Sequence, residues 1–228
     1  MWIIFLKEFI KFRTIFWVYC AIICLDFVWI NLNLKEILNY QSIKDLNYSV
    51  LYFRKFDVVF LDFINISFAI SVAFMSIYRE REKGRLRLFF NLPIGDLRLF
   101  LLLIFAPAFF IVIVFLSEFL AIYSLLKSKF LYEICFEISR FFVLNMIFAL
   151  CAYFAICAIS LQNSFKKILF YAIVFITQIY LYFIINPKLI DAKAFFLNVN
   201  LIYYEIVGIV FWIFVGFNSL KDYKQGRK

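Results

Sequence analysis

The sequence contains no histidine among its 228 residues. Histidine is the side chain that titrates near neutral pH and a common metal ligand, so its absence removes many acid–base and metal-dependent mechanisms. The five cysteines form no CxxC pair, and most lie in apolar runs, where a thiol behaves as a small hydrophobic group. We therefore expect no metal site and no cofactor.

The phosphate-binding motif GxxxxGK[ST] is also absent, and no acidic strand end is available to hold magnesium. We expect that this chain does not hydrolyse ATP and is not an enzyme. The formal charge is +9, but the basic residues are spread over several segments. This distribution favours contact with anionic lipid headgroups and argues against a nucleic-acid partner.

What the chain has in excess is apolar surface. Hydrophobic residues make up 66% of the sequence and aromatic residues 23%, and the mean hydropathy is +0.95. A soluble domain is about 45–50% apolar. One domain of this size cannot bury such an excess in its own core, so lipid must cover much of it. The composition predicts an all-α integral membrane protein with a single transmembrane domain.

Membrane spans require about 20 mostly apolar residues. Within the bilayer every backbone group must be paired inside the protein, so each span is expected to be a helix. Most of the 24 Lys and Arg residues fall on one side if both termini are cytoplasmic, which is the orientation that we predict. The six predicted spans are residues 14–34, 56–78, 99–125, 138–161, 168–185 and 201–220.

The segment before the first span, residues 1–13, has an amphipathic pattern. Lys7, Glu8 and Lys11 cluster on one side, and apolar residues cover the rest. A helix lying in the membrane interface, with its basic residues at the headgroups, fits this pattern. A simple extension of the first span is the alternative that remains open.

Residues 79–98 read REREKGRLRLFFNLPIGDLR and join the second and third predicted spans on the cytoplasmic side. Gly84 permits a change of direction, and Pro93 ends the helix that follows it. Between them, Leu86, Phe89 and Phe90 form an apolar stripe at helical spacing. Such a short amphipathic helix must lie in the interface or dock onto a partner, and the pattern alone leaves both open.

This stretch resembles the E-R-E-x-G-T-L-E-x-L-L-x-x-P pattern of ABC type-2 exporter permeases. The run departs from that pattern at Arg85 and Arg87, where the family often has Thr and Glu, so the helix here is more basic. The Gly–Leu–Pro framework is unchanged. The matching positions are Glu80, Arg81, Glu82, Gly84, Leu86, Leu88, Leu92 and Pro93.

The resemblance implies a coupling helix that inserts into a groove on a separate cytoplasmic ABC ATPase. Glu80 and Glu82 would anchor its N-terminal end. It also implies a dimer with a second copy or a sister permease, placed in the bacterial inner membrane among lipids. The apolar contacts in the groove would come from Leu86, Leu88, Phe89 and Phe90.

Three acidic residues, Asp26, Asp62 and Glu118, lie inside predicted spans one, two and three. A carboxylate in lipid costs several kcal/mol unless it is neutral, paired or hydrated. One interpretation places these acids on a translocation path. The other makes them neutral or hydrogen-bonded packing residues, and helix–helix hydrogen bonding explains Asn65 and Asn145 equally well.

Two other classes of function remain alternatives. A membrane scaffold or assembly factor would use the segment between Gly84 and Pro93 to dock a partner that is not an ATPase. An intramembrane enzyme would use Asp26, Asp62 or Glu118, but it would have to work without histidine or a metal site. The transported substrate cannot be identified from the sequence.

Overall fold

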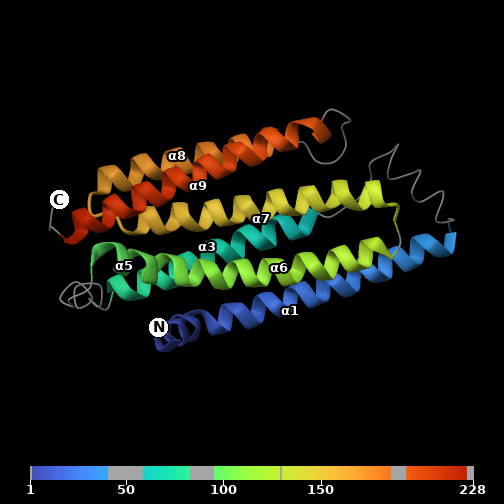
Figure 1. Ribbon diagram of the computed structural model, residues 1–228, viewed down its shortest axis with the longest axis horizontal. Helices are drawn as coiled ribbons and strands as arrows, with labels where there is room; N and C mark the ends of the chain where they lie inside the picture. Colours follow the sequence, from blue (N-terminus) through green and yellow to red (C-terminus); the bar gives the residue numbers. More distant parts are fainter. Residues whose placement is uncertain (1, 41–58, 83–94, 129, 186–193, 225–228) are drawn as a thin grey trace.

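The chain forms a bundle of long helices with both termini at the same end (Figure 1). The computed structural model describes residues 2–40, 59–82, 95–128, 130–185 and 194–224, and these are almost entirely helical. The elements are α1 (Trp2–Tyr40), α3 (Val59–Glu82), α5 (Asp96–Phe100), the π-helical turn η1 (Leu101–Phe105), α6 (Ala106–Lys127), α7 (Tyr132–Ser160), α8 (Phe165–Ile185) and α9 (Ala194–Lys224).

Several of these helices are long and apolar enough to cross a membrane, and the helical content confirms the predicted all-α class. The helix α3 has 24 residues, but its apolar part, Phe63–Ile77, is shorter than the others. Six spans with a fixed orientation therefore stay a prediction. Within the described ranges, five segments have sufficient length, namely Arg13–Leu32, Leu97–Lys127, Ser139–Ser160, Phe165–Ile184 and Leu201–Asp222.

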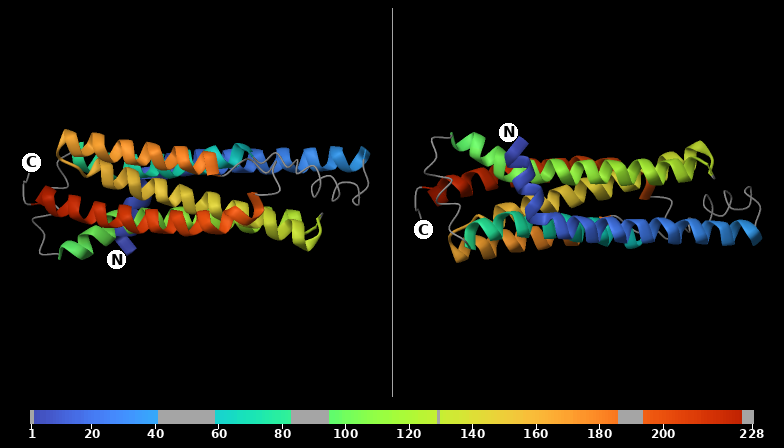
Figure 2. Two further views of the ribbon diagram at one scale, coloured as in Figure 1. Left: turned by 90° about the horizontal axis from the view of Figure 1, so that it is seen from above. Right: turned by 90° about the horizontal axis from the view of Figure 1, so that it is seen from below.

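The helices run past the spans predicted for them. Residues 35–40 continue α1 and residues 194–200 belong to α9, so both helices extend beyond the predicted spans 14–34 and 201–220. The helices continue beyond the apolar runs, because an α-helix keeps the same backbone hydrogen bonds inside and outside the bilayer. Residues 2–13 are likewise continuous with the first span, and α1 bends near its N-terminal end (Figure 2).

The helix α7 is the centre of the bundle and packs most extensively against α3 and α9. Its buried face is rich in small residues, including Ala149, Ala152, Ala155 and Ala158. Small side chains let helices in a membrane approach closely. Van der Waals contacts between the helices then stabilise their association, because the hydrophobic effect gives little driving force within lipid. The helices α1 and α8 are the most exposed, with apolar side chains toward the surrounding lipid.

A π-helical turn interrupts the third long helix between α5 and α6. Pro107 has no backbone N–H, so the preceding turn cannot complete an ordinary α-helical pattern there. The Tyr153 hydroxyl of α7 donates a hydrogen bond to the Ile104 carbonyl at 2.8 Å. The turn is thus held by the central helix, and π-turns within α-helices are rare and occur frequently at functional sites.

Candidate functional site

The predicted docking stretch is bounded by two helix ends on the same side of the bundle. The helix α3 ends at Glu82, and α5 begins at Asp96 (Figure 1). Glu80 and Glu82 lie in the last turns of α3. The remaining predicted docking residues, Gly84, Leu86, Leu88, Phe89, Phe90 and Pro93, lie outside the described residues.

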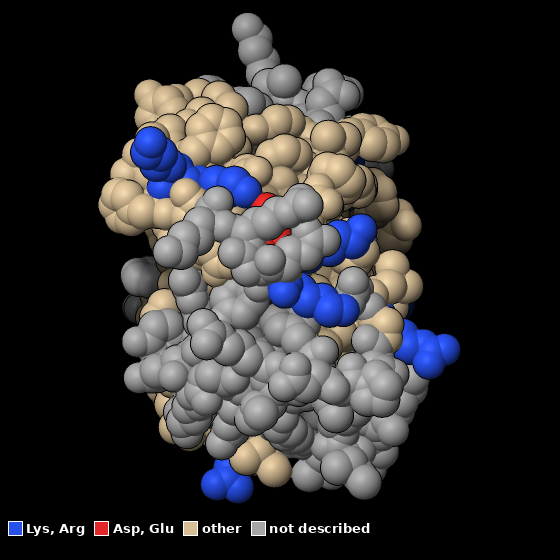
Figure 3. Space-filling view, turned by 90° about the vertical axis from the view of Figure 1, so that its left-hand side faces the viewer, with Lys and Arg blue, Asp and Glu red and all other residues tan. Residues whose placement is uncertain are grey.

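The end of the bundle that holds both termini carries exposed basic side chains (Figure 3). Lys221 is also placed over the Phe217 ring, with its Nζ 4.4 Å from the ring centroid. Basic residues at one end match the positive-inside pattern that predicted a cytoplasmic location. The described exposed members of this group are Arg13, Arg98, Lys166, Lys167, Lys221 and Lys224, and Lys11 is half-buried.

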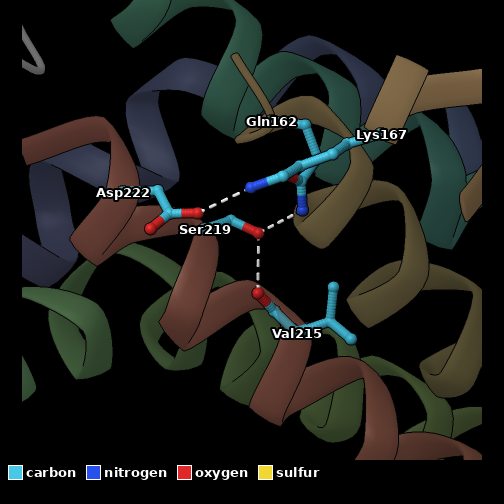
Figure 4. A network of polar contacts seen from close by, with 5 residues as sticks. All are labelled: Gln162, Lys167, Val215, Ser219 and Asp222. Atoms are coloured by element: carbon cyan, nitrogen blue, oxygen red, sulfur yellow. Dashed lines mark hydrogen bonds and ion pairs between the residues drawn. The ribbon is translucent and has the colours of Figure 1, made fainter. Parts of the chain in front are cut away.

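Polar contacts at this end join the turn between α7 and α8 to the last turns of α9 (Figure 4). The buried Gln162 amide donates to the Ser219 hydroxyl, which in turn donates to the Val215 carbonyl at 2.6 Å. Nearer the surface, Lys167 Nζ lies 2.8 Å from Asp222 Oδ2. An exposed ion pair contributes only about 0–1 kcal/mol, so the buried amide–hydroxyl contact is the more important link.

Glu118 takes part in a buried three-helix contact. Its Oε2 is 3.0 Å from the Tyr19 hydroxyl of α1, and its Oε1 is 3.4 Å from Asn65 Nδ2 of α3. The Tyr19 hydroxyl also donates to Asn65 Oδ1, and the Tyr19 ring stacks on Phe68 with centroids 3.9 Å apart. All four side chains are buried. The carboxyl group is therefore hydrogen-bonded to two neighbouring helices, which favours the packing interpretation of this acid.

The structure does not describe the side chains of the other two acids of the predicted translocation path. Asp26 lies in α1 and Asp62 in α3, but their side chains are outside the described residues. A path through these three acids therefore stays a prediction. Among the polar residues of α3, Asn65 faces Glu118, whereas Ser67 and Ser71 line a groove between α1 and α3.

Tyr19→Phe is expected to weaken the attachment of α1 to the bundle. The change keeps the ring that stacks on Phe68 but removes the hydroxyl between Asn65 and Glu118. Hydrogen bonds between membrane helices contribute about 0.6–2 kcal/mol, so we expect a loss of that size in the free energy of unfolding. The measurement is denaturant unfolding of the purified protein in detergent micelles.

Tyr180→Phe provides the matched control for this change. Tyr180 is exposed on α8, and we expect its loss of a hydroxyl to leave stability unchanged. An equal effect of the two substitutions would contradict the assignment of the Tyr19 hydroxyl to the α1 contact.

A second buried polar contact, which the sequence analysis missed, joins α7, α8 and α9. Gln178 Nε2 donates to Glu205 Oε2 and lies the same distance, 3.0 Å, from Cys151 Sγ. Trp212 Nε1 donates to Gln178 Oε1 at 2.9 Å. Both N–H donors of the Gln178 amide and one of the two acceptor sites on its oxygen are thereby used. The signal was available, because Glu205 is an acid within a predicted span, as Glu118 is.

Gly208 makes this second contact possible. A Cβ atom at this position would lie 2.6 Å from Gln178 Nε2 and 3.1 Å from Cys151 Sγ. The Oε1 atom of the buried Glu205 has no hydrogen-bond partner among the described residues. One glycine, one amide and one acid therefore fix how closely α9 approaches α7 and α8, with no spare volume at the centre of the contact.

The cysteines behave as expected for small apolar residues. Cys151 and Cys157 are buried in α7, and Cys151 takes part in the Gln178 contact. Burial also raises the pKa of the Cys135 thiol, which lies in the first turn of α7. A thiol with a raised pKa is a poor nucleophile, so neither observation indicates covalent chemistry. Among the described residues, no cluster of Cys, Asp and Glu is arranged to hold a metal ion.

The site is thus a set of polar links between helices, beside a docking stretch at one end of the bundle. The described links can set the positions of the helices relative to one another. Comparisons with protein-family models, curated proteins and solved structures each give no match.

Proposed function

We propose that this chain is the membrane-spanning permease subunit of an ATP-binding-cassette exporter. The observation that carries the proposal is the run from Glu80 to Ile94, with its acidic start, Gly84, three leucines and Pro93. No phosphate-binding loop is present in the chain. ATP would therefore be hydrolysed by a separate cytoplasmic subunit that docks onto this run.

The position of the flanking helix ends supports this proposal. The helices α3 and α5 meet the run at the end of the bundle that also holds both termini and the basic side chains listed above (Figures 1 and 3). This end is the one that we assign to the cytoplasm. The docking run would then lie on the cytoplasmic surface of the bundle, where a cytoplasmic ATPase can bind it.

The packing of α3 suggests how a push on the run would spread. The helix α3 packs against α7, α1 and α6, and the α5 end continues through the π-turn into α6. Closure of two ATP-bound ATPase subunits would displace the run and tilt these helices together. The polar links at Glu118 and Gln178 would determine which helices move as one unit.

The remaining features of the proposal follow the family resemblance. Two permease subunits would pair, either as two copies or with a sister permease, in the bacterial inner membrane. Six spans would place both termini in the cytoplasm. Asp26, Asp62 and Glu118 would lie along or beside the translocation path, and the resemblance names no substrate.

The test is co-purification with the ABC ATPase encoded nearest to this chain. The two proteins are expressed together, extracted in mild detergent and separated by size. We expect them to elute together at a constant ratio, with ATP hydrolysis faster than that of the ATPase alone. Repeated failure of any ABC ATPase to bind, with the permease intact and monodisperse, would contradict the exporter and favour the scaffold.

A further inference from the structure

Glu205 is an acid that is fully buried in the apolar part of α9. The apolar segment of this helix begins at Leu201, so Glu205 lies about 6 Å, or one helical turn, inside the end of the bundle away from the termini. The neighbouring Tyr203 and Tyr204 are exposed, whereas Glu205 is not. The helix ends that bound the docking run lie at the opposite end, so the proposed function gives this acid no role.

The hydrogen bonds around Glu205 fix the Gln178 amide as a donor. The Trp212 indole can only donate, so the amide oxygen of Gln178 must face it, and Nε1 lies 2.9 Å from Oε1. The amide nitrogen therefore faces Glu205, where Nε2 lies 3.0 Å from Oε2. The carboxyl group thus has a neutral donor at Oε2, while Oε1 has no hydrogen-bond partner within the described part of the chain.

The described groups that face Glu205 from the neighbouring helices are neutral. The helix α7 presents the Cys151 thiol, which lies within hydrogen-bonding distance of the carboxyl group and of the Gln178 amide. The helix α8 presents Gln178 and, one turn further on, the buried Tyr182. On α9 itself, the adjacent titratable group is the Tyr204 hydroxyl. Thiols and phenols are uncharged at neutral pH.

The described basic residues of the packed helices are too far away to balance a charge on this acid. Arg140 is the basic residue of α7, and it lies about 16 Å along the axis from Cys151, with its guanidinium group over the Phe136 ring. An ionised Glu205 would therefore be an unbalanced charge inside the bilayer, which is strongly unfavourable. The basic residues of α8, α9 and α5 lie at the other end of the bundle and are Lys166, Lys167, Lys221, Lys224 and Arg98.

We propose that Glu205 is a proton-binding site, and that α9 packs against α7 and α8 as observed with a proton on this carboxyl group. The inference does not depend on the proposed exporter function. Protonation removes the charge, and the Gln178 amide can still donate to the neutral group. When the O–H bond breaks, the proton passes to water at the nearby end of the bundle, away from the termini. The charge that remains then favours separation of α9 from α8.

Infrared spectroscopy of the purified protein tests for the bound proton directly. A protonated carboxyl group has a C=O stretch that is separate from the amide bands. We expect this band in the difference between the unmodified protein and Glu205→Gln at neutral pH, because glutamine keeps the size of the side chain and cannot hold the proton. Asp222→Asn is the control. Asp222 is paired with Lys167 at the other end of the bundle, so its loss should remove no such band.

The pH dependence of unfolding tests how the proton affects the packing. The unfolded chain releases the proton of Glu205 above about pH 4, whereas the folded bundle keeps it, so raising the pH favours unfolding. The measurement is the unfolding equilibrium constant in detergent micelles, divided by that of Glu205→Gln. We expect this ratio to rise about tenfold for each pH unit above about pH 5, until the folded carboxyl group ionises. The same ratio for Asp222→Asn should rise equally.

Three outcomes would overturn the proposal. A difference spectrum for Glu205→Gln without the carboxyl band would show that the group is ionised. The same pH dependence of unfolding in the unmodified protein and in Glu205→Gln would show that the proton is held elsewhere. The third test needs no variant, because the carboxyl band of the unmodified protein must disappear as the pH is raised. Absence of that band at neutral pH would overturn the proposal even without a folded Glu205→Gln protein.

Discussion

Phe89→Asp is expected to abolish binding of the ATPase while leaving the chain folded in the membrane. Phe89 lies in the apolar stripe of the docking run, with Leu86 one turn before it. An aspartate there would have to be desolvated in the partner's groove, which costs several kcal/mol. A loss of about 3 kcal/mol corresponds to more than a hundredfold in affinity. The measurement is co-elution with the ATPase, together with its stimulated ATP hydrolysis.

Asn91→Asp is the matched control within the same run. It adds the same charge, but residue 91 is about 140° from Leu86 around a helix and so lies away from the apolar stripe. We expect it to bind the ATPase almost normally. Both variants should be found in the membrane fraction and elute as the unmodified chain does. Full stimulation of the ATPase by the Phe89→Asp protein would refute the assignment of the run to docking.

Gly208→Ala is expected to destabilise the contact between α7, α8 and α9 strongly for so small a change. The new methyl group would lie 2.6 Å from Gln178 Nε2, so the amide would have to move. Movement would break its bonds to Glu205 and Trp212 in a buried site. Overpacking and the lost bonds each cost about 1–3 kcal/mol, against a gain of about 1 kcal/mol in helix propensity. We expect a net loss of about 1–5 kcal/mol in the free energy of unfolding.

Gly216→Ala, two turns further along α9, is the control that makes the same substitution in the same helix at a position with more space. Its added Cβ would be 3.5 Å or more from Phe100 and Ala158, which is ordinary contact. We expect this variant to be neutral or slightly stabilised. Adding Gly208→Ala to a Gln178→Ala protein should cost little, because the amide that the methyl group displaces is gone. Equal losses in both backgrounds would show that the amide is not the cause.

The positions of the apolar helices could be predicted from the sequence because the bilayer imposes a length on them. Predicted spans such as 138–161 and 201–220 lie within a few residues of the apolar segments Ser139–Ser160 and Leu201–Asp222. The ends of the helices could not be predicted in this way. The continuation of α1 to Tyr40 depends on local helix propensity outside the lipid, where hydropathy carries no information.

The polar contacts were predicted only in part, because they depend on which helices are neighbours. Glu118 was recognised as an acid within a span, but its partners Tyr19 and Asn65 come from helices 99 and 53 residues away in the sequence. Gln178 was overlooked for the same reason, since an amide in an apolar run has no meaning until Trp212 and Glu205 are placed beside it. Hydropathy identifies the apolar helices, but the hydrogen-bonded pairs between them can be identified only once the packing of the helices is known.

The number of residues in the π-helical turn before α6 determines how α5 is rotated about its axis relative to α6. Each residue turns an α-helix by about 100°, so one residue more or fewer in Leu101–Phe105 would rotate α5 by that amount about its axis. Such a rotation would carry the buried Leu99 and Phe100 out of the core. An insertion or deletion there would therefore redirect the chain where it arrives from residues 83–94, although every side chain of that run would be unchanged.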